Sequence, residues 1–204
     1  MDRIDLVSQA RTVLHLNDAG EFTKPSPRQY PHQWNWDAAF IALGLSHYDV
    51  PRAITEVHSL LRAQWRDGMV PHIIYHTGKS DYFPPPEFWQ TENFAYAGTV
   101  ASSALTQPPV LATMVWLIHE RTPSIDFLRE VFSQLVAWHR WLHTSRDVDG
   151  TGLTCLIHPW ESGMDNSPLW ADALDRITPT DLPPFKRRDT VHVAADERPL
   201  APDY

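Results

Sequence analysis

The most informative segment of the sequence places two carboxylates beside a tryptophan. Residues 158–168 read His-Pro-Trp-Glu-Ser-Gly-Met-Asp-Asn-Ser-Pro, so Glu161 and Asp165 lie four positions apart and close to Trp160. A carboxyl group packed against an indole is partly shielded from water, which raises its pKa and suits a proton donor near neutral pH. Hydrolysis of a glycosidic bond needs such an acid together with a second carboxylate. The pattern is equally compatible with a helix-capping Asp and a surface Glu.

A second segment combines tryptophans with a carboxylate at the start of an expected helix. Residues 30–37 read Tyr-Pro-His-Gln-Trp-Asn-Trp-Asp, so Trp34 and Trp36 flank an Asn and precede Asp37. Flat sugar faces stack on indoles, and carboxylates accept hydrogen bonds from sugar hydroxyls. The alternative is that Asp37 caps the helix and both tryptophans belong to the core. The chain holds 9 Trp, which favours a cleft because so many indoles are difficult to bury completely.

Two further segments carry polar or aromatic groups suited to a sugar site. Gln107 lies at a loop-to-helix junction, Thr106-Gln107-Pro108-Pro109, where it either binds a hydroxyl group or belongs to a helix-capping region. Residues 81–90 contain Tyr82 and read Asp-Tyr-Phe-Pro-Pro-Pro-Glu-Phe-Trp-Gln, which indicates a rigid aromatic wall. The alternative for this segment is a polyproline-like loop that covers a helix end.

Charge and motifs argue against several other classes of protein. The formal net charge is −8, from 17 basic and 25 acidic residues, so the basic patch expected of a nucleic-acid binder is not evident. The phosphate-binding and nucleophile motifs G-x-G-x-x-G, P-loop and G-x-S-x-G do not occur, and we expect no cofactor. His139 and His143 are four residues apart, but a third ligand is not apparent, so we expect no metal site.

The sequence also carries expectations about location. Its single cysteine, Cys155, cannot form an internal disulfide, which fits a reducing compartment. The first residues, MDRIDLVSQA, do not follow the basic-then-apolar order of a secretion signal. No apolar run approaches the length of a membrane span. We therefore expect a cytoplasmic protein that does not associate with membranes.

Hydrophobic periodicity predicts an all-α chain with about six helices separated by loops. The expected helices cover residues 3–16, 36–48, 50–67, 108–118, 123–144 and 169–177. Asp49 is expected to cap the third of them, and Thr122 the fifth. Residues 92–105 are ambiguous and suit a tightly packed helix. Several helices are apolar on more than one side, which indicates neighbours on both sides, as in a layered helical toroid.

Taken in order, these segments resemble the mannosylglycerate and glucosylglycerate hydrolases, which are relatives of glycoside hydrolase family 63. The specific matches are Trp-Asn-Trp-Asp at 34–37 and Trp-Glu-Ser-Gly-Met-Asp-Asn-Ser-Pro at 160–168, with Tyr-Phe-Pro and Thr-Gln-Pro-Pro between them. The resemblance runs from about residue 28 to residue 204. It implies an incomplete (α/α)6 barrel, with residues 1–177 as the N-terminal half of the domain and 178–204 as an extended, truncated tail.

The resemblance also implies an inverting mechanism, with Asp165 as the general acid and a small α-glycoside, such as glucosylglycerate or mannosylglycerate, as the substrate. The family's sugar pocket matches eight further residues of this sequence: Tyr30, Trp34, Trp36, Asp37, Tyr82, Gln107, Trp160 and Gly163.

The catalytic base and the glycerate-binding residues belong to the later half of the family's chain. Glu92 and Glu161 are candidates for the base by charge only, so we expect these 204 residues to be inactive, or nearly so, by themselves. We also expect them to expose apolar helix faces. One alternative is a non-catalytic carbohydrate-binding half-barrel. Another is a different (α/α)6 enzyme such as an epimerase, which would require paired catalytic histidines.

Overall fold

Helices make up most of the structure, as the hydrophobic periodicity predicts. The computed structural model describes residues 3–77, 82–178, 187, 189–192 and 194–196. The five long helices are α1 Arg3–Asn17, α2 Asn35–Leu45, α3 Val50–Leu61, α4 Leu111–Arg121 and α5 Ile125–Ser145. The shorter elements are β1 Gln33–Trp34, β2 Ile73–Ile74, η1 Pro86–Trp89, η2 Thr91–Asn93, η3 Pro159–Ser162, η4 Pro168–Trp170, α6 Ala171–Leu174 and α7 Asp189–His192. Most of the expected tail, 178–204, lies outside the described residues.

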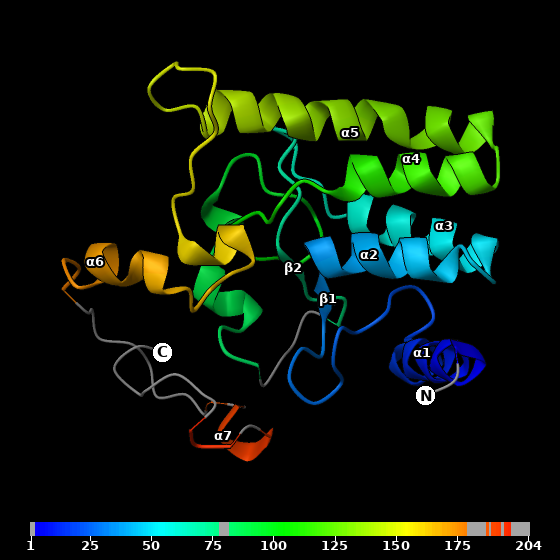
Figure 1. Ribbon diagram of the computed structural model, residues 1–204. Coiled ribbons are helices and arrows are strands. Elements are labelled where there is room, and N and C mark those ends of the chain that lie inside the picture. The colour runs from blue at the N-terminus through cyan, green and yellow to red at the C-terminus, as the bar shows by residue number, and fades with distance from the viewer. Residues whose placement is uncertain (1–2, 78–81, 179–186, 188, 193, 197–204) are drawn as a thin grey trace.

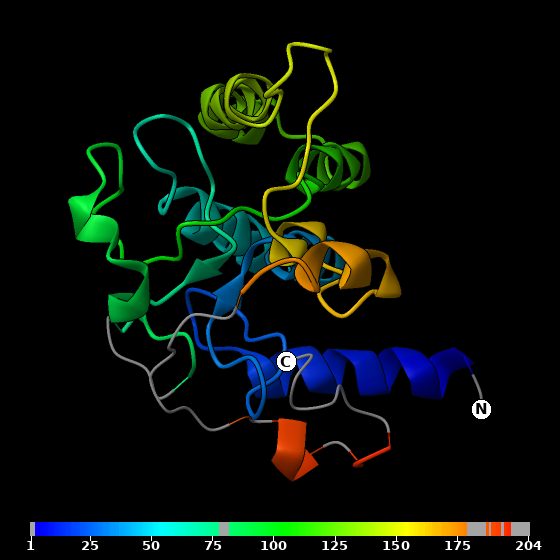
Figure 2. The same cartoon turned by 90° about the vertical axis from the view of Figure 1, so that its left-hand side faces the viewer.

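Four of the long helices form the body of the fold. Helix α2 contacts both α3 and α4, and α5 contacts the same two helices. Figures 1 and 2 show α4 and α5 as an antiparallel pair that lies over α2 and α3. On α2, Ala38, Ala39 and Ala42 are buried, and their small side chains allow the neighbouring helices to approach closely. Trp138 of α5 is the largest fully buried side chain of the core.

The layered arrangement gathers the long loops at one end of the molecule. Helices α2 and α4 begin at this end, and α3 and α5 finish there (Figure 1). The antiparallel strands β1 and β2 lie at the same end, with Gln33 opposite Ile74 and Trp34 opposite Ile73. All the residues predicted to form the sugar site therefore come from segments at this end of the helices.

Helix α3 starts as predicted and ends earlier than predicted. The Asp49 side chain accepts a hydrogen bond from the Arg52 backbone N–H at 3.0 Å, so it caps the helix. The helix stops at Leu61, six residues before the expected Asp-Gly signal. Beyond it, the Gln64 amide donates to the carbonyl oxygens of Gly68 and Gln134, both at 2.8 Å. Contacts with α5 thus redirect a chain that local periodicity would have continued as helix.

Residues 92–105, the ambiguous segment, do not form the tightly packed helix that their small residues would suit. After η2, residues 94–100 form turns and bends. Residues 101–105 then run beside β2, where Ser103 N donates to Ile73 O at 3.0 Å and Tyr75 N donates to Ala101 O at 2.9 Å. Ser102 and Ser103 are almost completely buried. The small residues therefore fit the chain into a narrow space beside a strand, and they do not build a helix interface.

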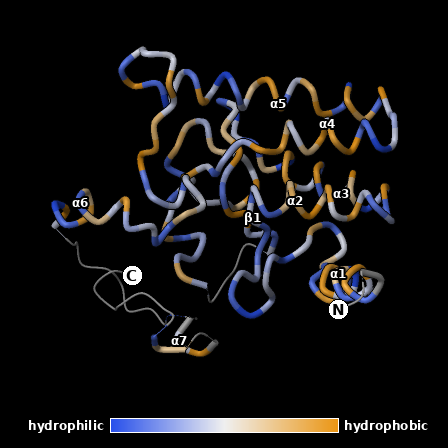
Figure 3. The backbone as a smooth tube through the Cα atoms, in the orientation of Figure 1, coloured by the Kyte–Doolittle hydropathy of each residue, from blue (hydrophilic) through white to orange (hydrophobic). Residues whose placement is uncertain are grey.

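A further correction concerns the start of α5, whereas the exposure of Phe132 on this helix fits the expectation of exposed apolar helix faces. Ser124, not Thr122, is the N-cap, and its hydroxyl accepts a hydrogen bond from Phe127 N at 3.2 Å. Val131 is buried, but Phe132 is 66% exposed. An apolar groove of about 480 Å³ runs between α4 and α5, from Ala112 near the start of α4 to His143 near the end of α5, and Phe132 lines it. Figure 3 shows hydrophobic positions along these two helices.

Candidate active site

All the predicted aromatic site residues except Trp36 form one continuous cluster at the loop end. Trp34 of β1 meets Tyr30 and Tyr82 edge-on, with ring centroids 5.1 and 5.2 Å apart. Tyr82 also contacts His32, whose ring lies 4.8 Å from that of Tyr75. We call these rings, together with those of His72, Trp89 and Trp160, the aromatic cluster. It brings together Tyr30, Trp34 and Tyr82, which are up to 52 positions apart in the sequence.

The aromatic cluster continues to the segment that carries Asp165. The Trp89 indole N–H donates to the Tyr75 hydroxyl at 2.9 Å, and the Trp89 and Trp160 rings lie 6.1 Å apart. Trp160 also lies 5.9 Å from the ring of His72, a buried histidine that sequence reasoning missed. Burial lowers the pKa of His72 to about 3, so its ring is neutral. The Ser103 hydroxyl lies 2.6 Å from its Nδ1 atom and fixes its orientation.

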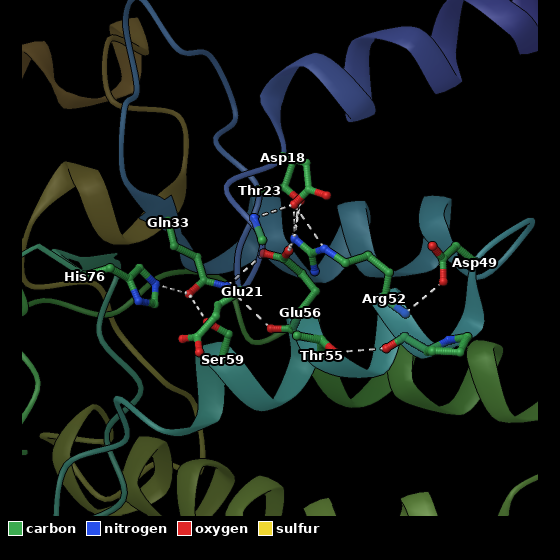
Figure 4. Close-up of polar contacts among 12 residues, drawn as sticks. Asp18, Glu21, Thr23, Gln33, Asp49, Arg52, Thr55, Glu56, Ser59 and His76 are labelled. Atoms are coloured by element: carbon green, nitrogen blue, oxygen red, sulfur yellow. Dashed lines mark hydrogen bonds and ion pairs between the residues drawn. The ribbon is translucent and has the colours of Figure 1, made fainter.

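A buried polar network holds β1, and with it Trp34, in place (Figure 4). The Gln33 amide donates to Glu56 at 2.8 Å, and the Gln33 carbonyl oxygen accepts from Ser59 at 3.2 Å. Glu56 also accepts hydrogen bonds from Thr23 at 3.0 Å and from Arg52 at 2.9 Å. Glu56 is completely buried, so Arg52 supplies the compensating charge that such a carboxylate needs. The local sequence contained no signal for this network.

Asp37 does not cap α2, so the capping alternative is wrong. The N-cap position is Trp34, which makes no side-chain capping bond, and Asp37 lies in the first turn. The Asn35 side chain donates to the carbonyl oxygens of Val70 and Pro71, both at 3.2 Å, which anchors this end of α2. The carboxyl group of Asp37 remains half-buried, and burial raises its pKa to about 6.

Gln107 and Gly163 connect the two predicted segments through Trp36. The Gln107 side-chain oxygen accepts a hydrogen bond from Trp36 N at 3.1 Å, so this nearly buried side chain holds the backbone of the first segment. Gly163 packs directly on the Trp36 indole, because a Cβ atom at that position would lie 2.6 Å from Cζ2 of Trp36. Gly163 also has a φ of +68°, which favours glycine. The residue is therefore required by both its backbone conformation and its close contact.

The structure places the carboxyl groups of Asp37 and Asp165 close enough to influence each other. Asp165 is exposed as a whole residue, but desolvation of its carboxyl group raises its pKa to about 6, and the negative charge of Asp37 adds to the effect. A carboxylic acid with such a pKa retains its proton over part of the range near neutrality, as a general acid must.

Glu161 and Glu92, the two candidates for a base, do not face Asp165 as free carboxylates. Glu161 is 2% exposed, and its two oxygens accept hydrogen bonds from Arg146 at 2.6 and 3.0 Å. Glu92 lies exposed in η2. Among the residues that the structure describes, Asp37 is the one carboxylate that raises the pKa of Asp165.

The described ranges contain no group of three or more His, Cys, Asp or Glu side chains placed to hold a metal ion. None of the helices within those ranges is both long and apolar enough to cross a membrane.

A helical fold with two carboxyl groups that influence each other electrostatically fits the class of glycoside hydrolases, and comparison with known proteins specifies the family. Residues 30–204 match the family described as the mannosylglycerate hydrolase MGH1-like glycoside hydrolase domain. The chain belongs to this family.

Two curated relatives illustrate the similarity. A mannosylglycerate hydrolase from Thermus thermophilus is 47% identical over 201 residues, which cover 96% of this chain and 48% of the relative. A glucosylglycerate hydrolase from Mycolicibacterium hassiacum is 42% identical over 211 residues, which cover 98% of this chain and 47% of the relative. The chain thus spans about half the length of these proteins.

A solved structure of the family supports the fold. The GH63 mannosylglycerate hydrolase from Thermus thermophilus, in complex with Tris and D-glycerate, superposes with a TM-score of 0.87 at 46% identity. The match covers 98% of this chain and 48% of that structure.

Proposed function

We propose that this chain carries the acid half of an inverting glycoside hydrolase that acts on small α-glycosides of glycerate. The observation that carries the proposal is the electrostatic influence of Asp37 on Asp165, whose segments meet where Gly163 packs on Trp36. Both carboxyl groups have pKa values of about 6, which suits proton transfer near neutral pH. The names of the family relatives supply the class of substrate, mannosylglycerate or glucosylglycerate.

In the proposed reaction, protonated Asp165 donates its proton to the glycosidic oxygen. The bond between the anomeric carbon and that oxygen breaks, and glycerate leaves with the proton. As that bond breaks, a water molecule bonds to the anomeric carbon from the opposite face while a carboxylate base takes its proton, so the anomeric configuration is inverted. In inverting enzymes the two carboxyl groups lie roughly 6.5–9.5 Å apart, which leaves room for the water molecule.

The remaining predicted residues have roles in sugar binding under this proposal. Trp36 and Trp160 are half-buried and offer indole faces for stacking, and Asp37 accepts hydrogen bonds from sugar hydroxyls. Trp34 is 6% exposed. Its role is therefore to support the neighbouring rings Tyr30 and Tyr82, which retain more exposed surface.

We further propose that turnover requires the part of the family fold that these 204 residues do not span. Glu161 is occupied by Arg146, so a separate carboxylate must act as the base. The helices α2 to α5 would form part of an (α/α)6 barrel whose other helices complete the site. The 204 residues by themselves should then bind sugar weakly and fail to hydrolyse it.

The test is an Asp165→Asn substitution in a family-length protein, in which the Thermus thermophilus relative supplies the remaining part. Loss of a general acid lowers the rate by about 10²–10⁴-fold, and NMR of the first-formed sugar anomer reports inversion or retention. Hydrolysis of mannosylglycerate or glucosylglycerate at a near-original rate in the variant would show that Asp165 is not the acid.

A second candidate function is sugar binding without catalysis, and the engagement of Glu161 by Arg146 favours it for the chain by itself. Calorimetry of the 204-residue chain with glucosylglycerate separates the two. Binding that persists in Asp165→Asn, with no hydrolysis in the family-length protein, supports a binding module over an enzyme.

A further inference from the structure

A second buried ion pair, between Arg146 and Glu161, involves the segment that carries Asp165. Arg146 follows α5 as its C-cap residue, and its guanidinium group donates to both oxygens of Glu161. The side chains are 9% and 1% exposed, so the pair is almost completely removed from water. The Arg146 guanidinium also lies 4.4 Å above the Trp141 ring, which fixes its plane.

Glu161 connects its own segment to two others, the end of α5 and the backbone at Thr106. In addition to Arg146, it accepts hydrogen bonds from the backbone N–H groups of Thr106 at 3.4 Å and Ile157 at 3.3 Å. Thr106 precedes Gln107, which holds the backbone of Trp36. The contacts therefore run from the end of α5, through Glu161, to the segment that positions Trp36.

Glu161 also lies close in sequence to the loop that carries Asp165, which we call the acid-bearing loop. Glu161 precedes Gly163, which packs on the indole of Trp36, and Asp165 follows Gly163. The loop is thus held at Glu161 by α5 and the Thr106 backbone, and at Gly163 by Trp36. A shift of Glu161 would move the Gly163–Trp36 contact and the carboxyl group of Asp165 together.

A gain in folding stability does not by itself explain why this ion pair is buried. Burying two charges costs desolvation that their attraction only partly offsets, and well-packed apolar residues in the same space are often at least as stabilising. An ion pair with bidentate geometry instead fixes both distance and orientation. Two carboxylate oxygens that meet one guanidinium and two backbone N–H groups leave the loop little freedom.

We propose that the Glu161–Arg146 pair positions the acid-bearing loop so that Asp165 is held beside Trp36 and Asp37. This inference rests on the proposed role of Asp165 as the proton donor. Glu161 and Arg146 are positioning residues, since they contact the loop and its support and do not take part in the reaction.

The test is a titration of the Asp165 carboxyl carbon by NMR in the 204-residue chain and its variants. Arg146→Lys keeps both charges but removes the bidentate geometry, whereas Glu161→Gln keeps the shape and removes one charge. If the loop loses its position, Asp165 becomes better solvated and moves away from Asp37. Its titration midpoint then falls from about 6 toward 3.8 in both variants.

Glu56→Gln is the matched control, because Glu56 is an equally buried carboxylate that an arginine binds at 2.9 Å. Glu56 contacts β1 and not the acid-bearing loop. The control should lower the melting temperature and leave the Asp165 midpoint unchanged. If Arg146→Lys does not fold, the double variant Arg146→Met with Glu161→Leu removes both charges, fills the space and serves the same test.

The possible results distinguish the alternatives. A fall of the midpoint in Arg146→Lys and Glu161→Gln, but not in Glu56→Gln, supports positioning. A fall in Glu161→Gln alone indicates a direct charge effect of the uncompensated arginine and overturns the proposal, as does an unchanged midpoint in both. The titration needs no turnover, so its result is independent of the hydrolysis assay of Asp165→Asn, which tests the proposed function separately.

Discussion

Replacing Gly163 by alanine tests the contact that joins the two segments of the site. A Cβ atom at this position would lie 2.6 Å from Cζ2 and 2.7 Å from Cη2 of Trp36, well inside contact distance. Trp36 has to tilt away, or the loop that carries Asp165 has to retreat. The φ of +68° adds a backbone penalty of about 1–2 kcal/mol for any residue with a Cβ atom.

A second glycine separates these two contributions. Gly150 has a φ of +64°, almost the same as Gly163, but a Cβ atom there meets nothing within 4 Å. Gly150→Ala therefore carries the backbone penalty of about 1–2 kcal/mol alone. Forcing a side chain into occupied space typically costs a further 1–3 kcal/mol or so. We expect Gly163→Ala to lower the free energy of unfolding by roughly 2–5 kcal/mol.

The assay is urea unfolding of the wild type and both variants, combined with near-ultraviolet circular dichroism to follow the tryptophans. Gly163→Ala should also change the tryptophan signal of the folded protein and weaken glucosylglycerate binding in calorimetry, whereas Gly150→Ala should change neither. Equal losses of stability in the two variants, with the same tryptophan signal, would refute the direct packing of Gly163 on Trp36.

Two further predictions follow from burial. Because the pKa of Asp37 is raised from 3.8 to about 6, the folded state binds more protons than the unfolded state between these values, and this residue makes stability fall as pH rises through that range. Asp37→Asn should remove this fall of stability with rising pH and raise the melting temperature at pH 7. It should also lower the NMR titration midpoint of Asp165. An unchanged pH dependence of stability between about pH 4 and 6 in the variant would contradict this prediction. Leu60→Ala should cost about 2–5 kcal/mol in urea unfolding because Leu60 is completely buried. Leu153→Ala, a control at a 77% exposed position, should stay within about 0.5 kcal/mol; equal costs would argue against the described core.

Much of the helical framework could be predicted because its signals are local. Apolar residues repeat with the helical period in α3 and α5, and Asp49 followed by Pro51 marks a helix start. The predictions failed where a distant segment competes with local preference. Residues 101–105 pair with β2 and its neighbours, and the chain after Leu61 bonds to α5 through Gln64, neither of which local periodicity can reveal.

The candidate site also combines features that the sequence could indicate with features that only the structure shows. The types and order of Trp36, Asp37, Trp160 and Asp165 were sufficient to indicate carboxylates and indoles in sugar chemistry. The roles of individual residues were not. Glu161 is indistinguishable from a catalytic carboxylate in the sequence, and only its burial against Arg146 shows that both oxygens are occupied.

The sequence by itself indicated which residues have side chains suited to sugar binding and proton donation, and where most long helices lie, because side-chain chemistry and the 3.6-residue period are local properties. Only the tertiary structure decided that Gly163 rests on Trp36, that Asp37 raises the pKa of Asp165, and that Glu161 is buried against Arg146. The physical reason is that burial and electrostatic coupling depend on which distant segments pack together. Those contacts join residues more than 120 positions apart, as between Trp36 and Gly163.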